Sequence, residues 1–261
     1  MGQLDDDAAV HPTGDGIYTT RLSSAWNIGT TPNGGYAMSA ALRALVEVTG
    51  RPDPASVTIH YLRPAIPDAD GTISTRVVRT GRSAAYATAT LVQEATARLT
   101  VTAVLADLSA PAGTTLDRSP TLAAPDIPPP DACTDRGDLD QGIELPVLSR
   151  VDVRVRADDV HATLDGWVRL RDGSSPTSTA LPLFADAFPP ALLAAHGRVG
   201  WVPTLELTVH VRRRPQAGWV QAHITCDDVA AGTMVETGTF WDSTGALVAR
   251  SRQLGLLLPR E

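Results

Sequence analysis

The chain has 261 residues, of which 43% are hydrophobic and 20% charged, and its formal net charge is −7. This composition is typical of a folded globular protein, and the acidic balance disfavours binding to nucleic acid, which needs a basic face. The segment Met1–Asp7 resembles no secretory signal, and no apolar run approaches the roughly 18 residues of a membrane span. We therefore expect a cytoplasmic protein that binds neither nucleic acid nor membrane.

Cysteines and histidines indicate no metal or redox centre. Cys133 and Cys226 lie far apart without Cys-x-x-Cys spacing, and the six histidines are scattered. The chain also lacks the Gly-x-Ser-x-Gly sequence that carries the nucleophile of an α/β-hydrolase. We expect no metal and no cofactor.

The first half of the chain predicts one helix followed by strands. The stretch from Tyr36 to Val48 is apolar over most of its surface and ends before Gly50, which predicts a buried helix. The segment Val57–Pro64 is rich in β-branched residues and predicts a strand that ends at its proline. Three further strands are expected, near residues 71–79, 84–93 and 97–105.

A proline-rich stretch separates the two halves. Between residues 109 and 147 it contains Pro111, Pro120, Pro125, Pro128, Pro129, Pro130 and Pro146. Proline fixes φ and removes a backbone donor, so this stretch predicts neither a helix nor a central strand. Loops of this length are uncommon inside one compact domain. We predict an N-terminal unit over 1–108, a linker over 109–147 and a C-terminal unit over 148–261.

The second half repeats the pattern of the first. A helical stretch is expected from Ser178 to Ala185, with a break at Pro189 and Pro190. The segment Leu207–Pro215 resembles Val57–Pro64, with one extra residue before its proline. Strands are expected near residues 219–226, 234–241 and 246–256. A buried helix followed by antiparallel strands, occurring twice, predicts an α+β architecture with sheets wrapped around central helices.

Four stretches of the chain resemble the acyl-CoA thioesterase II-like family. They are Pro32–Tyr36, His60–Pro64 with Arg79–Ser83, Ala185–Pro189, and Gly238–Phe240 with Gly245–Gln253. The resemblance implies a double hot-dog fold, in which two antiparallel sheets, each wrapped around a central helix, are fused in one chain. It also implies a thioesterase of fatty acid metabolism that hydrolyses acyl-CoA to a free fatty acid and CoA.

The resemblance implies a trio of side chains that activates water, all in the second half. Asp186 on the helical stretch and Gln253 on the last strand match the family's Asp and Gln. Thr204 is the preferred match for the threonine, with Thr208 in reserve because it has an ordinary counterpart in Thr58. From the residues alone, Asp186 could instead cap a turn or pair with an arginine, and Gln253 could point to solvent.

The chemistry of thioester hydrolysis suits these residue types. A partly buried carboxylate has a raised pKa and can act as a general base, while a hydroxyl and an amide can orient the attacking water. Backbone N–H groups of Gly34 and Gly35, at a helix start, could bind the developing oxyanion or could form only a helix-entry turn. Arg82 and Arg213 are candidates for contact with the CoA phosphates, with a solvated sheet edge as the alternative.

Two other functions remain open at this point. Hot-dog folds also support enoyl-thioester hydration and dehydration, for which Asp186 and His196 would form a poorly spaced pair. A non-catalytic acyl-CoA binding protein would keep the tunnel without the trio. We expect one active site per chain, at the seam between the two units, and a homodimer of chains.

Overall fold

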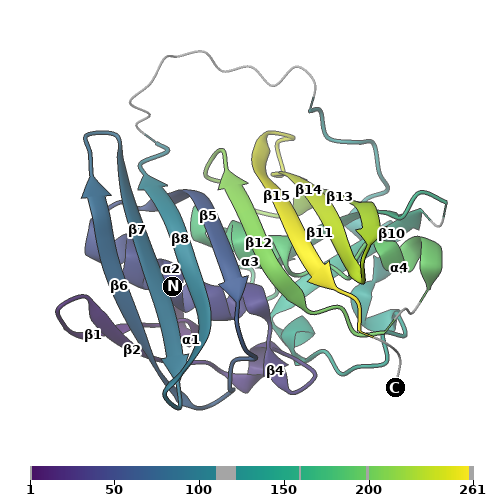
Figure 1. Ribbon diagram of the computed structural model, residues 1–261. Helices are drawn as coiled ribbons and strands as arrows, with labels where there is room; N and C mark the ends of the chain where they lie inside the picture. Colours follow the sequence, from purple (N-terminus) through teal and green to yellow (C-terminus); the bar gives the residue numbers. More distant parts are fainter. Residues whose placement is uncertain (1, 110–121, 159, 198–199, 259–261) are drawn as a thin grey trace.

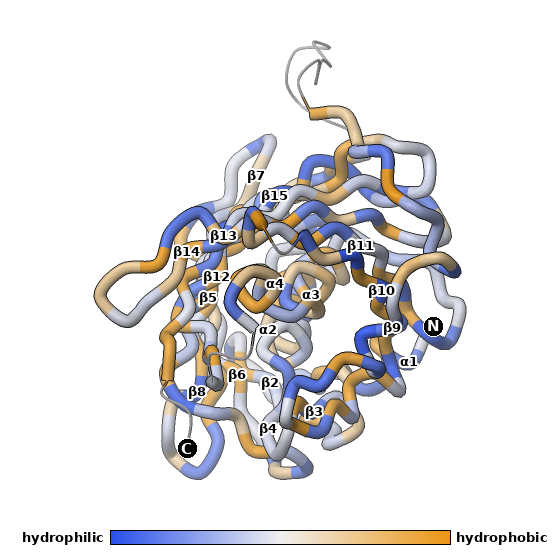
Figure 2. Tube along the Cα trace, turned by 90° about the vertical axis from the view of Figure 1, so that its right-hand side faces the viewer, coloured by the Kyte–Doolittle hydropathy of each residue, from blue (hydrophilic) through white to orange (hydrophobic). Residues whose placement is uncertain are grey.

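The computed structural model describes residues 2–109, 122–158, 160–197 and 200–258. Their main feature is a 13-stranded antiparallel sheet that curves around the helices (Figures 1 and 2). Its strands in spatial order are β1 (His11–Gly14), β2 (Ile17–Arg21), β6 (Asp70–Thr80), β7 (Ala84–Gln93), β8 (Thr96–Ala106), β5 (Asp53–Tyr61), β12 (Thr204–Val211), β15 (Leu247–Leu256), β14 (Thr233–Trp241), β13 (Val220–Ala230), β11 (Thr163–Leu170), β10 (Val151–Asp158) and β9 (Thr134–Asp135). A two-stranded sheet of β3 (Asn27–Ile28) and β4 (Thr31–Pro32) lies apart from it.

The expectation of two separate sheets is wrong, because β5 and β12 join the two halves into one. These strands pair antiparallel, with Thr58 opposite Thr208 and their hydroxyl oxygens 2.9 Å apart. Each strand would otherwise be the exposed edge of its own unit, with unpaired backbone donors and acceptors. Pairing the two edges satisfies these groups and produces a continuous sheet.

The sheet has an approximate two-fold order about the β5–β12 junction. Moving outward on the two sides, the paired elements are β8 with β15, β7 with β14, β6 with β13, β2 with β11, and β1 with β10. The expected strands of both halves are present, with ends close to the predicted ones. The strands β1, β2, β10 and β11 complete each half and were absent from the sequence-based expectation.

The long helix α2 (Gly34–Thr49) lies inside the curve of the sheet (Figure 2). Its first turn is capped by Asn33, whose Oδ1 accepts a hydrogen bond from the Tyr36 N–H, and it ends at Gly50 with a left-handed φ of 63°. Small and aliphatic residues bury the helix against β6, β7 and β8. The predicted helix is therefore confirmed, with its start two residues earlier.

The second half has short helices where the first has one long helix. A 3₁₀ turn, η5 (Ser178–Ala180), leads into α3 (Leu181–Ala185), and α4 (Leu192–His196) follows the expected break at Pro189 and Pro190. Asp186 is the C-cap of α3, so its side chain lies at the end of a helix rather than within one. The remaining short helix, α1 (Gln3–Asp7), lies near the N-terminus. None of the helices in the described part of the chain is long and apolar enough to cross a bilayer.

The predicted linker is described only in part, since Pro111 and Pro120 lie outside the described residues. From residue 122 onward it contains no long helix or strand. Its 3₁₀ helices are η2 (Pro130–Ala132), η3 (Arg136–Asp138) and η4 (Pro146–Ser149). Its strand β9 pairs with β10 of the C-terminal half, whereas its later part contacts the N-terminal half, where the Gly29 N–H donates to the Glu144 carbonyl oxygen at 2.7 Å. The unit boundaries at 108 and 148 stay a prediction.

Candidate active site

A cavity of about 310 Å³ opens where the first turn of α2 meets the end of α3. The last residue of β5, Tyr61, and the first residue of β12, Thr204, border it from the sheet. Its wall combines apolar side chains with a few polar ones. The polar and charged lining residues are Thr31, Asn33, Tyr61, Arg63, Arg98, Arg136, Gln141, Asp186, Thr204 and Gln253. The cavity therefore lies at the seam between the two halves.

Asp186 is held in this cavity by donors from the first half of the chain. Its Oδ2 accepts hydrogen bonds from the Gly35 N–H and from Asn33 Nδ2, both at 2.8 Å. Its Oδ1 faces the Thr204 hydroxyl at 3.5 Å. One carboxylate oxygen is thus fixed by two short bonds, while the other keeps one long contact.

Thr204 and Gln253 complete a chain of polar contacts with Asp186. Gln253 Nε2 donates to Thr204 Oγ1 at 2.8 Å, and that hydroxyl can donate onward to Asp186. The two residues lie on paired strands, because Thr204 begins β12 and Gln253 belongs to β15. Thr208 lies farther along β12 and its hydroxyl contacts Glu206 and Thr58 instead. The geometry favours Thr204 over Thr208 as the third member.

The surroundings of Asp186 raise its pKa from 3.8 to about 6. Burial of the carboxyl is the main cause, and it is opposed by the Gly35 N–H, the Arg136 charge, the Asn33 amide and the Thr204 hydroxyl. A carboxylate with a pKa near 6 is largely ionised at neutral pH and is a stronger base than an ordinary aspartate. The side chain can therefore accept a proton from a molecule in the cavity.

The two glycines at the start of α2 differ in their contacts. The Gly35 N–H is bound to Asp186, and a Cβ at Gly35 would lie 2.7 Å from the Cα of Leu183. For the Gly34 N–H, no hydrogen-bond partner is seen among the described residues. A Cβ at Gly34 would meet the Tyr61 ring at 2.8 Å. Gly35 therefore positions the acid, and Gly34 leaves a backbone donor beside the cavity.

Arg82 and Arg213 lie at the other end of the sheet. Arg82 is in the turn between β6 and β7, level with the start of β5, whereas the cavity borders the end of β5. Arg213 follows the last residue of β12, whereas the cavity borders its first. The structure does not bring either arginine together with the trio. Arg63 and Arg98 line the cavity instead.

Sequence reasoning missed seven of the ten polar residues of the cavity wall, among them Asn33, Tyr61 and Arg136. Asn33 was considered only as part of the entry to the helix. Asparagine is a common N-cap residue, and when its side-chain oxygen caps the helix its NH₂ group is left to donate elsewhere. Tyr61 belongs to the repeated strand, and its hydroxyl is buried without a hydrogen-bond partner. Arg136 lies in the proline-rich stretch, where no periodicity or motif marks it.

A second, more open cleft of about 1050 Å³ lies at the opposite end of the β5–β12 junction. It is bordered by the start of η5, the start of β5 and the end of β12, which is the two-fold counterpart of the first cavity. Asp53 is buried there and binds Arg214 Nη2 at 2.8 Å, the Ser178 hydroxyl at 2.6 Å and the Leu108 N–H at 2.8 Å. These contacts make it an ion-pair anchor rather than a second acid.

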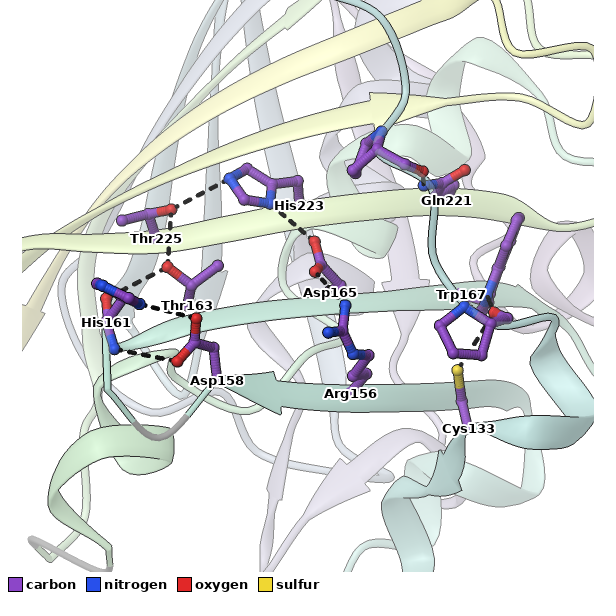
Figure 3. Close-up of polar contacts among 12 residues, drawn as sticks. Cys133, Arg156, Asp158, His161, Thr163, Asp165, Trp167, Gln221, His223 and Thr225 are labelled. Carbon is purple, nitrogen blue, oxygen red and sulfur yellow. Dashed lines mark hydrogen bonds and ion pairs between the residues drawn. The ribbon is translucent and has the colours of Figure 1, made fainter.

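A threonine, a histidine and an aspartate also line up on the β11 and β13 strands (Figure 3). His223 Nδ1 lies 2.7 Å from Asp165 Oδ1, and its Nε2 lies 3.4 Å from Thr225 Oγ1. The hydrogen bond to Asp165 raises the pKa of His223. The His223 side chain is 42% exposed, and none of these residues lines either cavity. We interpret this set as a surface network.

Two family models match the chain. An acyl-CoA thioesterase N-terminal domain matches residues 22–107, and an acyl-CoA thioesterase C-terminal domain matches residues 123–257. The chain is also 31% identical over 120 residues to an uncharacterised protein of Mycobacterium tuberculosis. That match covers 46% of this chain and 40% of the relative, so it spans less than half the length of either protein.

Solved structures agree over nearly the whole length. A proposed thioesterase II from Thermobifida fusca is 32% identical, with 99% of this chain and 98% of that chain covered and a TM-score of 0.86. A protein of unknown function with a hot-dog fold, from Alicyclobacillus acidocaldarius, is 23% identical and has a TM-score of 0.87 with both chains fully covered. The second likeness supports the hot-dog fold alone.

Proposed function

Because this chain belongs to the acyl-CoA thioesterase family, a family of thioester hydrolases, we propose that it hydrolyses an acyl-CoA through a water activated by Asp186. The observation that carries the proposal is the line of contacts from Gln253 through Thr204 to Asp186 at the cavity. The Oδ1 of Asp186 is the oxygen with spare acceptor capacity, so it is the one that takes the proton.

The reaction follows from this geometry. The water loses a proton to Asp186 as its oxygen attacks the thioester carbonyl carbon, giving a tetrahedral intermediate. The C–S bond then breaks, and the proton held on Asp186 passes to the leaving sulfur. The products are a carboxylic acid and the thiol of CoA, and no covalent enzyme intermediate forms.

Thr204 and Gln253 orient the water. The Thr204 hydroxyl accepts from Gln253 Nε2, which fixes its oxygen and turns its proton toward Asp186 or the water. A hydroxyl and a carboxylate beside one water fix the direction of its lone pair. The Gln253 amide acts on the water indirectly, through its hydrogen bond to Thr204.

The start of α2 is suited to stabilise the oxyanion. The Gly34 N–H is the first backbone donor of a 16-residue helix and borders the cavity. Its position adds the partial positive charge of the helix terminus to a direct hydrogen bond. We assign this role to Gly34, while Gly35 holds the base.

The arginine at the mouth of the cavity replaces the two that sequence reasoning chose for CoA. Arg63 is exposed and lines the cavity, so its guanidinium can meet phosphate oxygens outside it. The acyl chain then lies along the apolar part of the wall, which includes Ala37, Leu99 and Phe188.

The homodimer and the cytoplasmic location remain predictions, and a sedimentation mass near 27.5 kDa would contradict the dimer.

The geometry disfavours the two alternatives. A hydratase would need a histidine beside Asp186, but His196 is exposed at the end of α4 and does not line the cavity. A passive carrier has no use for a buried carboxylate in contact with a hydroxyl and an amide, because burying a charge is unfavourable.

The test is thiol release from acyl-CoAs of increasing chain length by the wild type and by Asp186→Asn. Loss of a general base is expected to lower kcat by about 10²–10⁴-fold. Thr204→Val should also lower kcat, whereas Thr208→Val, on the same strand, is the matched control and should not. Equal effects of the two threonine variants would contradict the trio, and hydrolysis that survives Asp186→Asn would move the base elsewhere.

A further inference from the structure

The segment between the two units contributes a buried guanidinium to the active site. Arg136, the first residue of η3, is only 4% exposed. Its Nη1 donates to the carbonyl oxygen of Ala187, the residue that follows Asp186. Its Nε and Nη2 donate to Gln141 Oε1 at 3.3 and 3.2 Å, and Gln141 Nε2 donates back to the Arg136 carbonyl oxygen at 3.2 Å.

Arg136 differs from the ion-paired arginines of the protein because its hydrogen-bond partners are neutral. Arg154 and Arg214 each contact carboxylates within 3.1 Å. Within the described residues, no carboxylate lies inside the 4.0 Å ion-pair distance of Arg136. Burying a charge without a counter-charge is strongly unfavourable, so a nearby negative group is needed to offset it. Asp186 is the carboxylate whose charge interacts with Arg136.

We propose that Arg136 is a positioning residue that supplies the counter-charge for the Asp186 carboxylate and so links the segment between the units to catalysis. This inference rests on the proposed role of Asp186 as the base. Two effects oppose each other in setting the ionisation of Asp186. Burial favours the neutral acid, and a fixed positive charge beside it favours the carboxylate.

The two other ionisable groups whose charges interact with that of Asp186 supply no counter-charge to it. Glu236 on β14 is buried and its charge interacts with that of Asp186. Tyr61 on β5 interacts with both Asp186 and Glu206 of β12. Arg63 and Arg98 also line the cavity. Among the described residues, Arg136 is the cation whose charge is a leading cause that lowers the pKa of Asp186.

A matched pair of substitutions separates charge from packing. Arg136→Met and Arg136→Lys both remove the forked hydrogen bonds to Ala187 and Gln141, but only the lysine keeps the positive charge. The measurement is the titration of Asp186, followed by its ¹³C carboxyl resonance and assigned by its disappearance in Asp186→Asn. This measurement needs no turnover, so it stands even where hydrolysis is absent.

We expect the Asp186 midpoint to rise by about one pH unit or more in Arg136→Met, since an adjacent opposite charge lowers an aspartate pKa by about 1–3 units. Starting from a pKa of about 6, a one-unit rise reduces the ionised fraction at pH 6 about fivefold and leaves it nearly unchanged at pH 8.5. The acid limb of kcat/KM should move with it. Arg136→Lys should keep the midpoint near that of the wild type.

A second variant covers the case in which Arg136→Met does not fold. Gln141→Glu keeps the acceptor for Nε and Nη2 and neutralises the guanidinium in place, so it should also raise the Asp186 midpoint. An unmoved midpoint in Arg136→Met and Gln141→Glu, or equal shifts in the Met and Lys variants, would overturn the inference. A raised midpoint without wild-type hydrolysis would refute the proposed function, and with it the link to catalysis, while the counter-charge on Asp186 would stand.

Discussion

Asp186 should make the protein less stable at neutral pH than an uncharged residue would. Its pKa is raised from 3.8 to about 6 by burial, so the folded protein holds a proton that the unfolded chain releases between these pH values. The associated stability is fully present below pH 3.8 and is lost as pH rises through about 6. Asp186→Asn removes this loss, because asparagine carries no charge.

The size of the effect follows from the shift. A rise of about two units corresponds to about 3 kcal/mol at most, at about 1.4 kcal/mol per unit. The carboxyl borders a cavity, and solvent there screens its charge, so we expect a gain of about 1–2 kcal/mol for Asp186→Asn at pH 8. That gain corresponds to a rise in Tm of roughly 2–8 °C for a domain of this size.

The assay is thermal or urea unfolding of the wild type and Asp186→Asn at pH 3.5, 5 and 8. The difference in stability between the two should be small at pH 3.5, about half of its full size at pH 5 and complete by pH 8, while thiol release is lost throughout. A variant that is no more stable than the wild type at pH 8, or a difference that does not change with pH, would refute the reasoning.

Asp53→Asn is a control for which the change in stability with pH should have the opposite sign. Burial alone would raise the pKa of Asp53, but the Arg214 guanidinium, the Ser178 hydroxyl and the Leu108 N–H outweigh it and lower the pKa below 3.8. A carboxylate of this kind contributes stability above the unfolded pKa and loses it in acid. Asp53→Asn should therefore destabilise the protein at pH 8, and less so once the pH falls below 3.8 toward the lowered pKa of the folded state.

Three further substitutions test other features of the cavity. Gly35→Ala places a Cβ 2.7 Å from the Leu183 backbone, so it should destabilise the protein by about 1–3 kcal/mol and lower kcat, and an unchanged Tm would contradict this. Glu236→Gln keeps the acceptor for the Ala191 N–H and removes a carboxyl whose pKa burial raises from 4.5 to about 7, so its unfolding temperature should exceed that of the wild type at pH 9 and match it below the unfolded pKa of 4.5. Tyr61→Phe removes a buried hydroxyl without a partner, so unfolding should show equal or higher stability, and a loss of more than about 1 kcal/mol would contradict it.

The sequence predicted most of what depends on local pattern. The apolar stretch before Gly50, the breaks at Pro189 and Pro190, and the β-branched runs each correspond to an element of the structure. The strand β10 also follows a local pattern, since apolar and charged residues alternate from Val151 to Arg156, although it was not among the expected strands. Local sequence patterns therefore account for these helices and strands.

What the sequence did not predict depends on contacts between distant segments. The union of the two sheets requires β5 to meet β12, about 150 residues apart, and no local pattern specifies an edge pairing. The same applies to Arg136, which lies 51 residues before the carbonyl oxygen that it binds. Arg82 and Arg213 were candidates for contact with the CoA phosphates, and only the register shows that they lie at the far end of the sheet.

The two-fold order of the sheet has a consequence for divergence. In a symmetric pair of identical chains every substitution appears twice, so two related clefts must keep the same residues. Here each cleft is encoded separately in one chain. One cleft carries Asp186, whose burial costs stability, and the other carries Asp53 in an ion pair that restrains the same junction. In a single chain, the proposed reactivity can thus belong to one of two related clefts and an ion-pair anchor to the other, which a symmetric dimer cannot do.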